Sequence, residues 1–295
     1  MRRSTKLIPL SCLFITSFLL SGCGGTNEPV KPEQPEQFDM TPVTTEIKRT
    51  FNYFIRTTNL NEDSDGFGLV QDRFTISDMC SMASTGFGLA AYPIYVEEGL
   101  MDKNEAQSIV SKSLDTFIRM QSDPTTSYAG CISHFVNKQT AKRWGQVEIS
   151  TIDTAILVSG AIVAGEYFKG EVKEKAQLLW GNVDFNKFKV TVNGKEHISM
   201  GVTDPQATPL QQISSWSGYA EHLMIYLLGA GNPVKARRFG PEIYANMTKT
   251  VGSYGENEFI YSWFGSLFTY QFSHAFFNFN LYKDNEGTNW MKIQS

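Results

Sequence analysis

The chain has 295 residues, with 26 Lys and Arg against 30 Asp and Glu, and therefore a formal net charge of -4. A mildly acidic chain without a Lys/Arg cluster argues against nucleic acid as a partner. The length is sufficient for a single large hydrophobic core or for two small ones.

The amino terminus predicts export and a lipid anchor. Two arginines and a lysine precede an apolar stretch over residues 7–20, which has signal-peptide length and is too short to span a membrane. The stretch runs into Leu-Ser-Gly-Cys at residues 20–23, which resembles a bacterial lipobox. We therefore expect residues 1–22 to be a signal peptide and Cys23 to be lipidated and to bind the membrane; the alternative is an ordinary signal peptide with a chance cysteine. The expected location is that of a bacterial lipoprotein, in the periplasm or at the outer membrane, with the cell surface also open.

The next segment is polar and predicts a tether. Residues 24–37 contain Gly, Thr, Asn, Pro, Glu, Lys and Gln with a single valine, too little apolar surface to order the segment. Regularly spaced prolines keep such a segment partly extended. We expect a lipid-anchored flexible tether over residues 23–37 and a folded domain over residues 38–295.

Two cysteines, Cys80 and Cys131, lie in the folded part. Export permits a disulfide between them. Two buried free thiols are the favoured alternative, because a free cysteine packs as a small hydrophobic residue.

Hydrophobic periodicity predicts a mostly helical chain. The expected helices span residues 41–58, 83–98, 103–121, 152–168, 171–180, 219–228 and 234–239. A helix that is apolar on all sides is buried, and one with a single apolar stripe lies outside it. Because the two kinds alternate here, the pattern predicts an all-α fold of two concentric helix layers, an α/α toroid; an irregular helical bundle is the alternative.

One segment interrupts the helices. Alternating side chains over residues 188–198 flank Asn193-Gly194, a dipeptide favoured in type I′ turns. We expect one small β-hairpin there.

The sequence lacks the motifs of several common kinds of catalysis and cofactor binding. There is no phosphate-binding glycine loop, no G-x-S-x-G and no H-E-x-x-H. The four histidines are too far apart in sequence to predict a metal cluster. We expect neither a cofactor nor a metal.

Three acids remain as candidates for catalysis: Glu148, Asp153 and Glu221. Glu148 precedes the most apolar expected helix, and Asp153 lies in the first turn of that helix. Glu221 lies on another apolar expected helix. Glycoside hydrolysis needs one protonated and one ionised carboxyl group, whose pKa values the environment must separate. The alternative from spacing alone is that Asp153 caps its helix and Glu221 forms a salt bridge.

Six ordered segments resemble the glycoamylase-like proteins, which are related to endo-β-1,2-glucanases of glycoside hydrolase family 144 and to a domain of cyclic β-1,2-glucan synthases. The matching segments are 68–73, 81–89, 130–135, 148–155, 216–233 and 267–271. The resemblance implies an (α/α)6 toroid whose acid-lined cleft cleaves β-glucan with inversion and without a metal.

The resemblance also implies roles for single residues. Acid-base catalysis and contacts with substrate hydroxyls fall to Glu148, Asp153 and Glu221. The residues implied to line the cleft and bind the oligo- or polysaccharide are Asp72, Arg73, His134, Trp216 and Tyr219.

The chain departs from the family pattern near its end. After Gln271 the family has an aromatic-Asp-Phe-Arg cluster following its histidine, whereas this chain reads His-Ala-Phe-Phe-Asn over residues 274–278. Family members also continue beyond the length of this chain. We therefore expect an incomplete toroid that lacks its C-terminal part, with a protein partner covering the open side. A β-1,2-glucan hydrolase is the favoured function, and a non-catalytic glycan-binding surface lipoprotein or an inactive relic of such a hydrolase is the alternative.

Overall fold

The computed structural model describes residues 39–262, 264–279, 281, 284–288 and 290. The expected signal peptide, the lipidated Cys23 and the tether lie outside the described residues. By their contacts, residues 41–295 make up one unit, and this unit carries every helix and strand described below.

Eight α-helices lie in the described part of the chain, and they confirm most of the expected positions. Their bounds are α1 (Thr41–Thr57), α2 (Met82–Glu97), α3 (Lys103–Gln121), α4 (Thr151–Phe168), α5 (Gly170–Asn182), α6 (Leu223–Ala230), α7 (Glu242–Ala245) and α8 (Phe268–Phe276). Two short 3-10 helices are η1 (Phe185–Phe188) and η2 (Lys235–Arg237).

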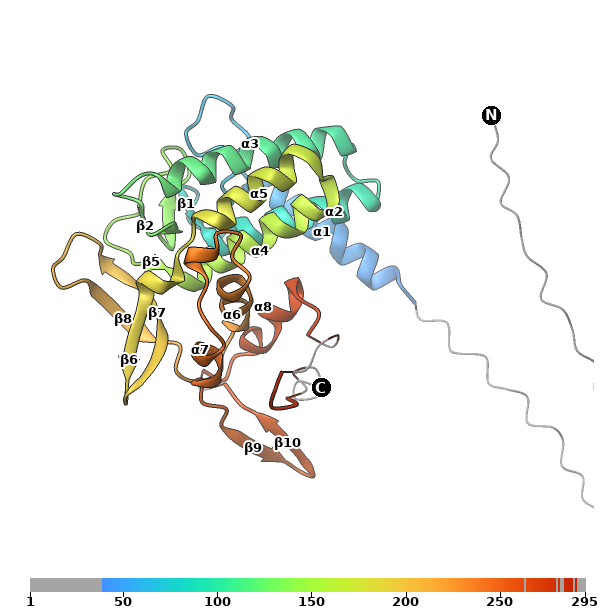
Figure 1. Ribbon diagram of the computed structural model, residues 1–295. Coiled ribbons are helices and arrows are strands. Elements are labelled where there is room, and N and C mark those ends of the chain that lie inside the picture. Colours follow the sequence, from blue (N-terminus) through green and yellow to red (C-terminus); the bar gives the residue numbers. More distant parts are fainter. Residues whose placement is uncertain (1–38, 263, 280, 282–283, 289, 291–295) are drawn as a thin grey trace, which may run out of the picture. The chain divides into compact units, whose positions relative to one another are not determined.

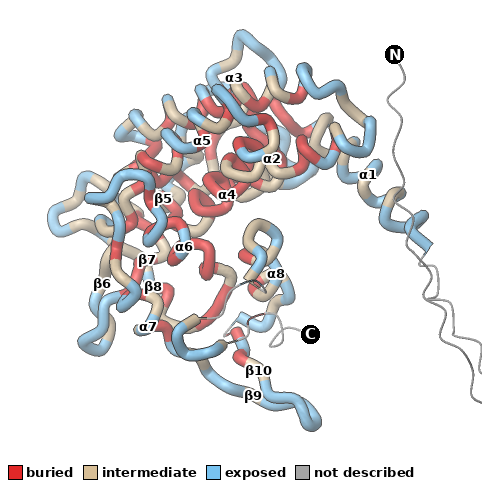
Figure 2. Tube along the Cα trace, turned by 45° about the vertical axis from the view of Figure 1, so that its right-hand side comes forward, coloured by how far each residue is buried: buried red, intermediate tan, exposed pale blue. Residues whose placement is uncertain are grey.

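The helices lie in two layers, consistent with part of a helical toroid (Figures 1 and 2). Helix α4 packs against α2, α5 and α6, and α3 packs against α5. Helices α2, α4 and α6 are buried along most of their length, whereas α3 and α5 keep one exposed face. Helix α4 is long and apolar enough to cross a membrane, but 72% of it is buried inside the fold, as in the core helix of a globular protein.

Ten strands, nine of them of two to five residues, lie in the described part of the chain, so the expectation of a single hairpin is wrong. The strands are β1 (Met79–Ser81), β2 (Ser127–Tyr128), β3 (Cys131–Ile132), β4 (Phe135–Asn137), β5 (Ile149–Ser150), β6 (Lys189–Val192), β7 (Lys195–Asp204), β8 (Gln211–Ser215), β9 (Val251–Tyr254) and β10 (Asn257–Ile260). They form three two-stranded sheets and one of four strands within the described residues. The expected hairpin is confirmed as β6–β7, and β7 also pairs with β5 and β8.

Two expected helices differ from the structure. Helix α6 begins at Leu223 rather than at residue 219; the chain before it pairs with Thr248, through a bridge at Gly218 and a bond from Tyr219 N–H to Thr248 O at 3.2 Å. The helix expected over residues 234–239 is the single 3-10 turn η2. There Arg238 Nε donates to Asn232 O at 2.6 Å, which folds the chain back on itself.

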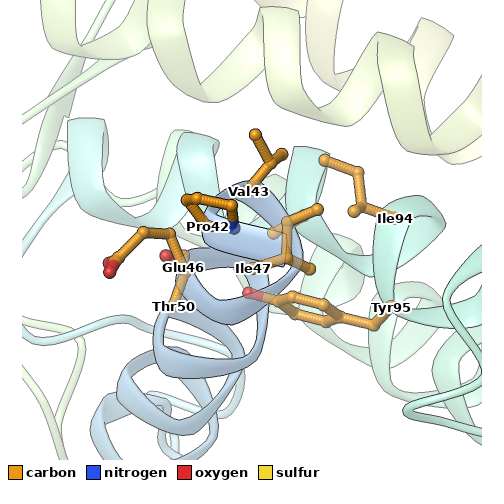
Figure 3. A pocket seen from close by; sticks show the side chains of 8 residues that line it. Pro42, Val43, Glu46, Ile47, Thr50, Ile94 and Tyr95 are labelled. Carbon is orange, nitrogen blue, oxygen red and sulfur yellow. The ribbon is translucent and has the colours of Figure 1, made fainter. Parts of the chain in front are cut away.

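Helices α1 and α2 enclose an apolar pocket of about 430 Å³ (Figure 3). Its lining includes Val43 and Ile47 from α1 and Ile94 and Tyr95 from α2. The Tyr95 hydroxyl is buried and has no hydrogen-bond partner among the described residues. With Glu46 as its one acidic side chain, this pocket does not contain the paired carboxyl groups expected for hydrolysis.

Both cysteines of the folded part are free and fully buried, as the favoured alternative stated. Burial raises the pKa of the Cys80 thiol to about 12. Burial also raises the pKa of the Cys131 thiol. Both thiols are therefore protonated core side chains.

Candidate active site

Main-chain pairing brings Glu148 and His134 together although they are fourteen residues apart. Ser133 and Ile149 form an antiparallel bridge, and the backbone N–H of His134 donates to Glu148 O at 2.9 Å. Strand β5 then leads directly into α4, which places Asp153 one turn further on. The chain therefore assembles these three side chains from two neighbouring segments.

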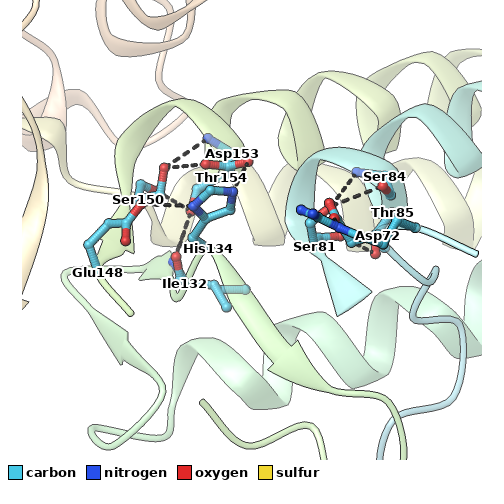
Figure 4. Close-up of polar contacts among 11 residues, drawn as sticks. Asp72, Ser81, Ser84, Thr85, Ile132, His134, Glu148, Ser150, Asp153 and Thr154 are labelled. Carbon is cyan, nitrogen blue, oxygen red and sulfur yellow. Dashed lines mark hydrogen bonds and ion pairs between the residues drawn. The ribbon is translucent and has the colours of Figure 1, made fainter. Parts of the chain in front are cut away.

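The His134 ring lies between two carboxylates (Figure 4). Its Nδ1 is 2.8 Å from Glu148 Oε1, and its Nε2 is 3.6 Å from Asp153 Oδ1. The side chains of His134 and Glu148 are each 29% exposed, and that of Asp153 is 10% exposed. The ring face stacks on Phe135 with centroids 3.7 Å apart, which fixes its orientation.

Asp153 also takes part in the cap of α4. Ser150 is the N-cap residue, and its Oγ accepts from the Asp153 backbone N–H at 3.2 Å. The same hydroxyl donates to Asp153 Oδ2 at 2.5 Å. Both bonds use the serine hydroxyl, so the Asp153 carboxylate does not accept from the backbone N–H of the cap residue as it would in a capping box. Asp153 is therefore not itself the cap, as the alternative from spacing had it, but is bonded to the cap residue Ser150, and its second oxygen faces His134.

The surroundings move the pKa values of the two carboxyl groups in opposite directions. The hydrogen bond from His134 lowers the pKa of Glu148. Burial raises the pKa of Asp153 and outweighs the charge of His134 and the bond from Ser150. Such a separation of carboxyl pKa values is what acid-base catalysis by two acids requires.

Glu221 lies directly before α6 rather than on it. Its carbonyl oxygen accepts a hydrogen bond from the Ser273 hydroxyl, and Ser273 Oγ also accepts from Met224 N at 3.1 Å. Burial raises the pKa of Glu221, and the charge of Asp153 raises it further. Glu221 is half-buried and lies within electrostatic reach of Asp153.

Asp72 and Arg73 pair with each other. Arg73 Nε donates to Asp72 Oδ2 at 2.8 Å, and the arginine side chain is largely exposed. The charge of Asp72 is one of those that raise the pKa of His134. Asp72 therefore lies within electrostatic reach of His134, and Arg73 neutralises part of the Asp72 charge.

Trp216 and Tyr219 are buried, with 5% and 2% of their surfaces exposed. Trp216 stacks on His222 with centroids 4.7 Å apart, and its indole N–H donates to Thr151 Oγ1 at 3.1 Å. Tyr219 packs against the ring of Trp290 at 4.9 Å. Thr151 is the first residue of α4, so Trp216 supports the helix start that carries Asp153.

Sequence reasoning missed three residues that hold the acids in place: Ser150, Thr151 and Ser273. The Ser-x-x-Asp spacing at residues 150–153 is a helix-start signal that identifies Ser150. No local signal identifies Thr151 or Ser273, because their partners lie 65 and 52 residues away. Among the described residues, no group of three or more His, Cys, Asp or Glu side chains is arranged to hold a metal ion.

Comparison with known proteins supports the resemblance found in the sequence. Residues 214–295 match a family model described as "Glycoamylase: Putative glucoamylase". This segment contains Glu221, whereas Glu148 and Asp153 precede it. No curated protein sequence matches the chain.

Solved structures share the fold. A β-1,2-glucanase from Parabacteroides distasonis aligns with a TM-score of 0.70 and 18% identity, over 88% of this chain and 40% of that one. An endo-β-1,2-glucanase from Chitinophaga pinensis, in complex with sophorotriose and glucose, aligns with a TM-score of 0.70 and 17% identity, over 88% of this chain and 65% of that one. A "putative glucoamylase" from Bacteroides uniformis aligns with a TM-score of 0.70 and 18% identity, over 88% of this chain and 64% of that one. The present chain thus spans less than two thirds of the length of each and shares with them the helical-toroid fold.

Proposed function

We propose that the protein is a glycoside hydrolase that cleaves β-glucan, with β-1,2-linked glucan as its substrate. The observation that carries the proposal is the contact of Glu148 and Asp153 with His134, with Glu221 within electrostatic reach of Asp153 and with the pKa of Glu148 lowered and that of Glu221 raised. The linkage is taken from the two β-1,2-glucanases that share the fold. The complete (α/α)6 toroid is the architecture we propose for the active protein.

The two pKa directions divide the catalytic roles. Glu221, whose pKa is raised, donates a proton to the leaving oxygen of the glycosidic bond. Glu148, whose pKa is lowered, accepts a proton from the attacking water. Asp153 is more buried than either and is bonded to Ser150, so we assign it to holding His134 and raising the pKa of Glu221. Attack by water from the face opposite the leaving group inverts the anomeric centre.

Single amide substitutions test this division. Release of reducing sugar from linear β-1,2-glucan is measured for the wild type, Glu148→Gln, Glu221→Gln and the control Glu171→Gln, an exposed residue of α5. We expect kcat to fall by on the order of 10²–10⁴-fold in the two site variants and to stay close to wild type in the control. A wild type that binds β-1,2-glucan but releases no sugar would contradict hydrolysis and support glycan binding alone.

We also propose that the mature protein is anchored through lipidated Cys23 in the periplasm or at the outer membrane. The support is the Leu-Ser-Gly-Cys sequence at residues 20–23. In a bacterial host, radiolabelled fatty acid should appear in the full chain and be absent from Cys23→Ala. Equal labelling of both proteins would contradict the anchor.

A further inference from the structure

We infer that His134 is a positioning residue that acts as a cation, holding Glu148 ionised and linking it to Asp153 through opposite ring nitrogens. This inference rests on the proposed function, in which Glu148 is the general base. It departs from the sequence-based expectation, in which His134 contacts the sugar.

The geometry suits a cationic ring, with a hydrogen bond on one side and an ion-pair contact on the other. Nδ1 lies 2.8 Å from Glu148 Oε1, and Nε2 lies 3.6 Å from Asp153 Oδ1. A neutral imidazole has one N–H and one acceptor nitrogen, whereas the imidazolium has two donors. Ionised carboxylates only accept, so the doubly protonated ring is the form that suits both neighbours.

The ring cannot easily turn away from this position. Its face stacks on Phe135 at a centroid distance of 3.7 Å and an interplanar angle of 19°. Its backbone N–H is bonded to Glu148 O, so the two residues are joined through main chain and side chain alike. The orientation is therefore a property of the fold and does not depend on a bound sugar.

The charges that face the ring come from two segments, one before β1 and the other across the junction of β5 and α4. They are Asp72 before β1, Glu148 before β5 and Asp153 in the first turn of α4. Burial alone lowers the pKa of His134, but the bond to Glu148 and the three negative charges raise it above its ordinary value. Arg143 is a second cation that lowers the pKa of Glu148, and its guanidinium donates to Val147 O at 2.6 Å and Thr203 O at 2.7 Å.

Loss of the imidazolium therefore has a specific consequence. Without it, Glu148 loses the bond that lowers its pKa, and half-burial then raises that pKa. Glu148, the base, then becomes protonated at mildly acidic pH, so the acid limb of the pH–rate profile shifts to higher pH. A residue with only a packing role would lower the rate equally at every pH.

The first test is the pH dependence of kcat/KM on β-1,2-glucan for the wild type, His134→Asn, His134→Lys and the control His274→Gln in α8. We expect His134→Asn to lose activity mainly on the acid side, by about tenfold for each pKa unit that Glu148 rises. His134→Lys, which restores a cation, should bring the acid limb back toward the wild type, and the control should not move it. An acid limb unchanged in His134→Asn would overturn the inference while leaving the hydrolase proposal intact.

A second measurement does not depend on activity. The protonation of His134 is followed by NMR in the full-length protein, with and without Glu148→Gln, and with Glu171→Gln as the control. We expect His134 to titrate above its ordinary pKa of about 6.5 in the wild type and to titrate lower in Glu148→Gln only. Titration at or below the ordinary value in the wild type would overturn the inference. If the pKa of His134 is raised but the protein cleaves no glucan, the proposed function is refuted and the inference about His134 stands.

Discussion

Asp153 is a single residue with two structural tasks. One carboxylate oxygen is bonded to the Ser150 hydroxyl of the helix cap, and the other faces His134. The alternative from residue spacing made Asp153 the helix cap, whereas the cap is Ser150, three residues earlier. The contact with His134 depends on the bridge between Ser133 and Ile149, a pairing that no local pattern reveals. From the sequence, a role at the helix start and a role in the site were alternatives for Asp153. In the structure the same residue takes part in both contacts.

Removal of the cap should weaken the protein measurably. In Ser150→Ala the Asp153 N–H and carboxylate both lose a partner, so we expect the free energy of unfolding to fall by about 1 kcal/mol, within a range of about 0.5–2. Urea denaturation provides the measurement. The matched control Ser108→Ala, at an exposed position inside α3, should change stability little. Equal effects of the two substitutions would show that the cap contributes nothing.

The His134–Glu148 pair should stabilise the fold in a limited pH window. The pKa of Glu148 is lowered by its partner, so its contribution is present above about pH 4.5 and is lost as the pH falls through the folded value. The pKa of His134 is raised, so its contribution is complete below about pH 6.5 and is lost as the pH rises through the folded value. The stability difference between wild type and Glu148→Gln should therefore be largest between these pH values.

Thermal melts across the pH range test this window, with Glu171→Gln as the control. Lys175, the partner of Glu171, has a pKa raised above that of an ordinary lysine, so that pair keeps its charges well above pH 7. A decline of the difference at high pH should thus be seen for Glu148→Gln and not for Glu171→Gln. The same profile for both variants would speak against a titrating His134.

At the scale of elements, the contact between α2 and α4 depends on two glycines. A Cβ on Gly160 of α4 would lie 1.9 Å from Gly86 O, and one on Gly86 of α2 would lie 2.4 Å from Ile156 O. The two backbones therefore touch directly, closer than side chains would allow. This contact holds α4, the helix that carries Asp153, against α2.

Gly160→Ala should destabilise the protein although alanine is the better helix former. The gain in helix propensity is about 1 kcal/mol, whereas separating two packed backbones costs on the order of 1–3 kcal/mol or more. The matched control is Gly181→Ala in α5, where the nearest atom to a new Cβ is a Val234 side-chain carbon at 3.5 Å. The control should be neutral or slightly stabilising in urea denaturation. Stabilisation by both substitutions would show that α2 and α4 can move apart freely.

Prediction of elements succeeded where the pattern was local and long. Helix α3 was predicted with its observed bounds, because a striped helix of 19 residues leaves a clear periodicity. The start of α6 was placed too early, because Gly218 and Tyr219 pair with Thr248, which is distant in sequence. Strands of two or three residues, such as β2 and β5, are too short to show any alternation.

At the scale of the whole molecule, one hydrophobic core joins the helix layers to the small sheets. It contains Leu157 of α4, Phe117 of α3, Ile198 of β7 and both buried cysteines. The two helix layers were predicted from the hydrophobic patterns of the helices. The strand pairing that brings Glu148 next to His134 was not predicted. The candidate acids were therefore named from the sequence, whereas their arrangement required the three-dimensional fold.

The buried thiols should be unreactive in the native protein. Cys80 and Cys131 are fully buried, and burial raises the pKa of both, so the reactive thiolate is scarce. We expect no labelling of either by a thiol reagent before unfolding, full labelling in denaturant, and a Tm that reductant does not change. Peptide mass spectrometry distinguishes these positions from Cys12 and Cys23. A peptide joined through Cys80 and Cys131 would contradict the free thiols.

The main-chain bond between His134 and Glu148 has a thermodynamic consequence for ligand recognition. Residues joined through their backbones have already lost their conformational entropy when the chain folds. Under the proposed function, a sugar that binds beside His134 and Glu148 meets groups that are preorganised, so the entropy lost on binding belongs mainly to the sugar's own torsions. Rigid oligosaccharides should therefore bind more tightly than flexible ones with the same hydroxyl contacts.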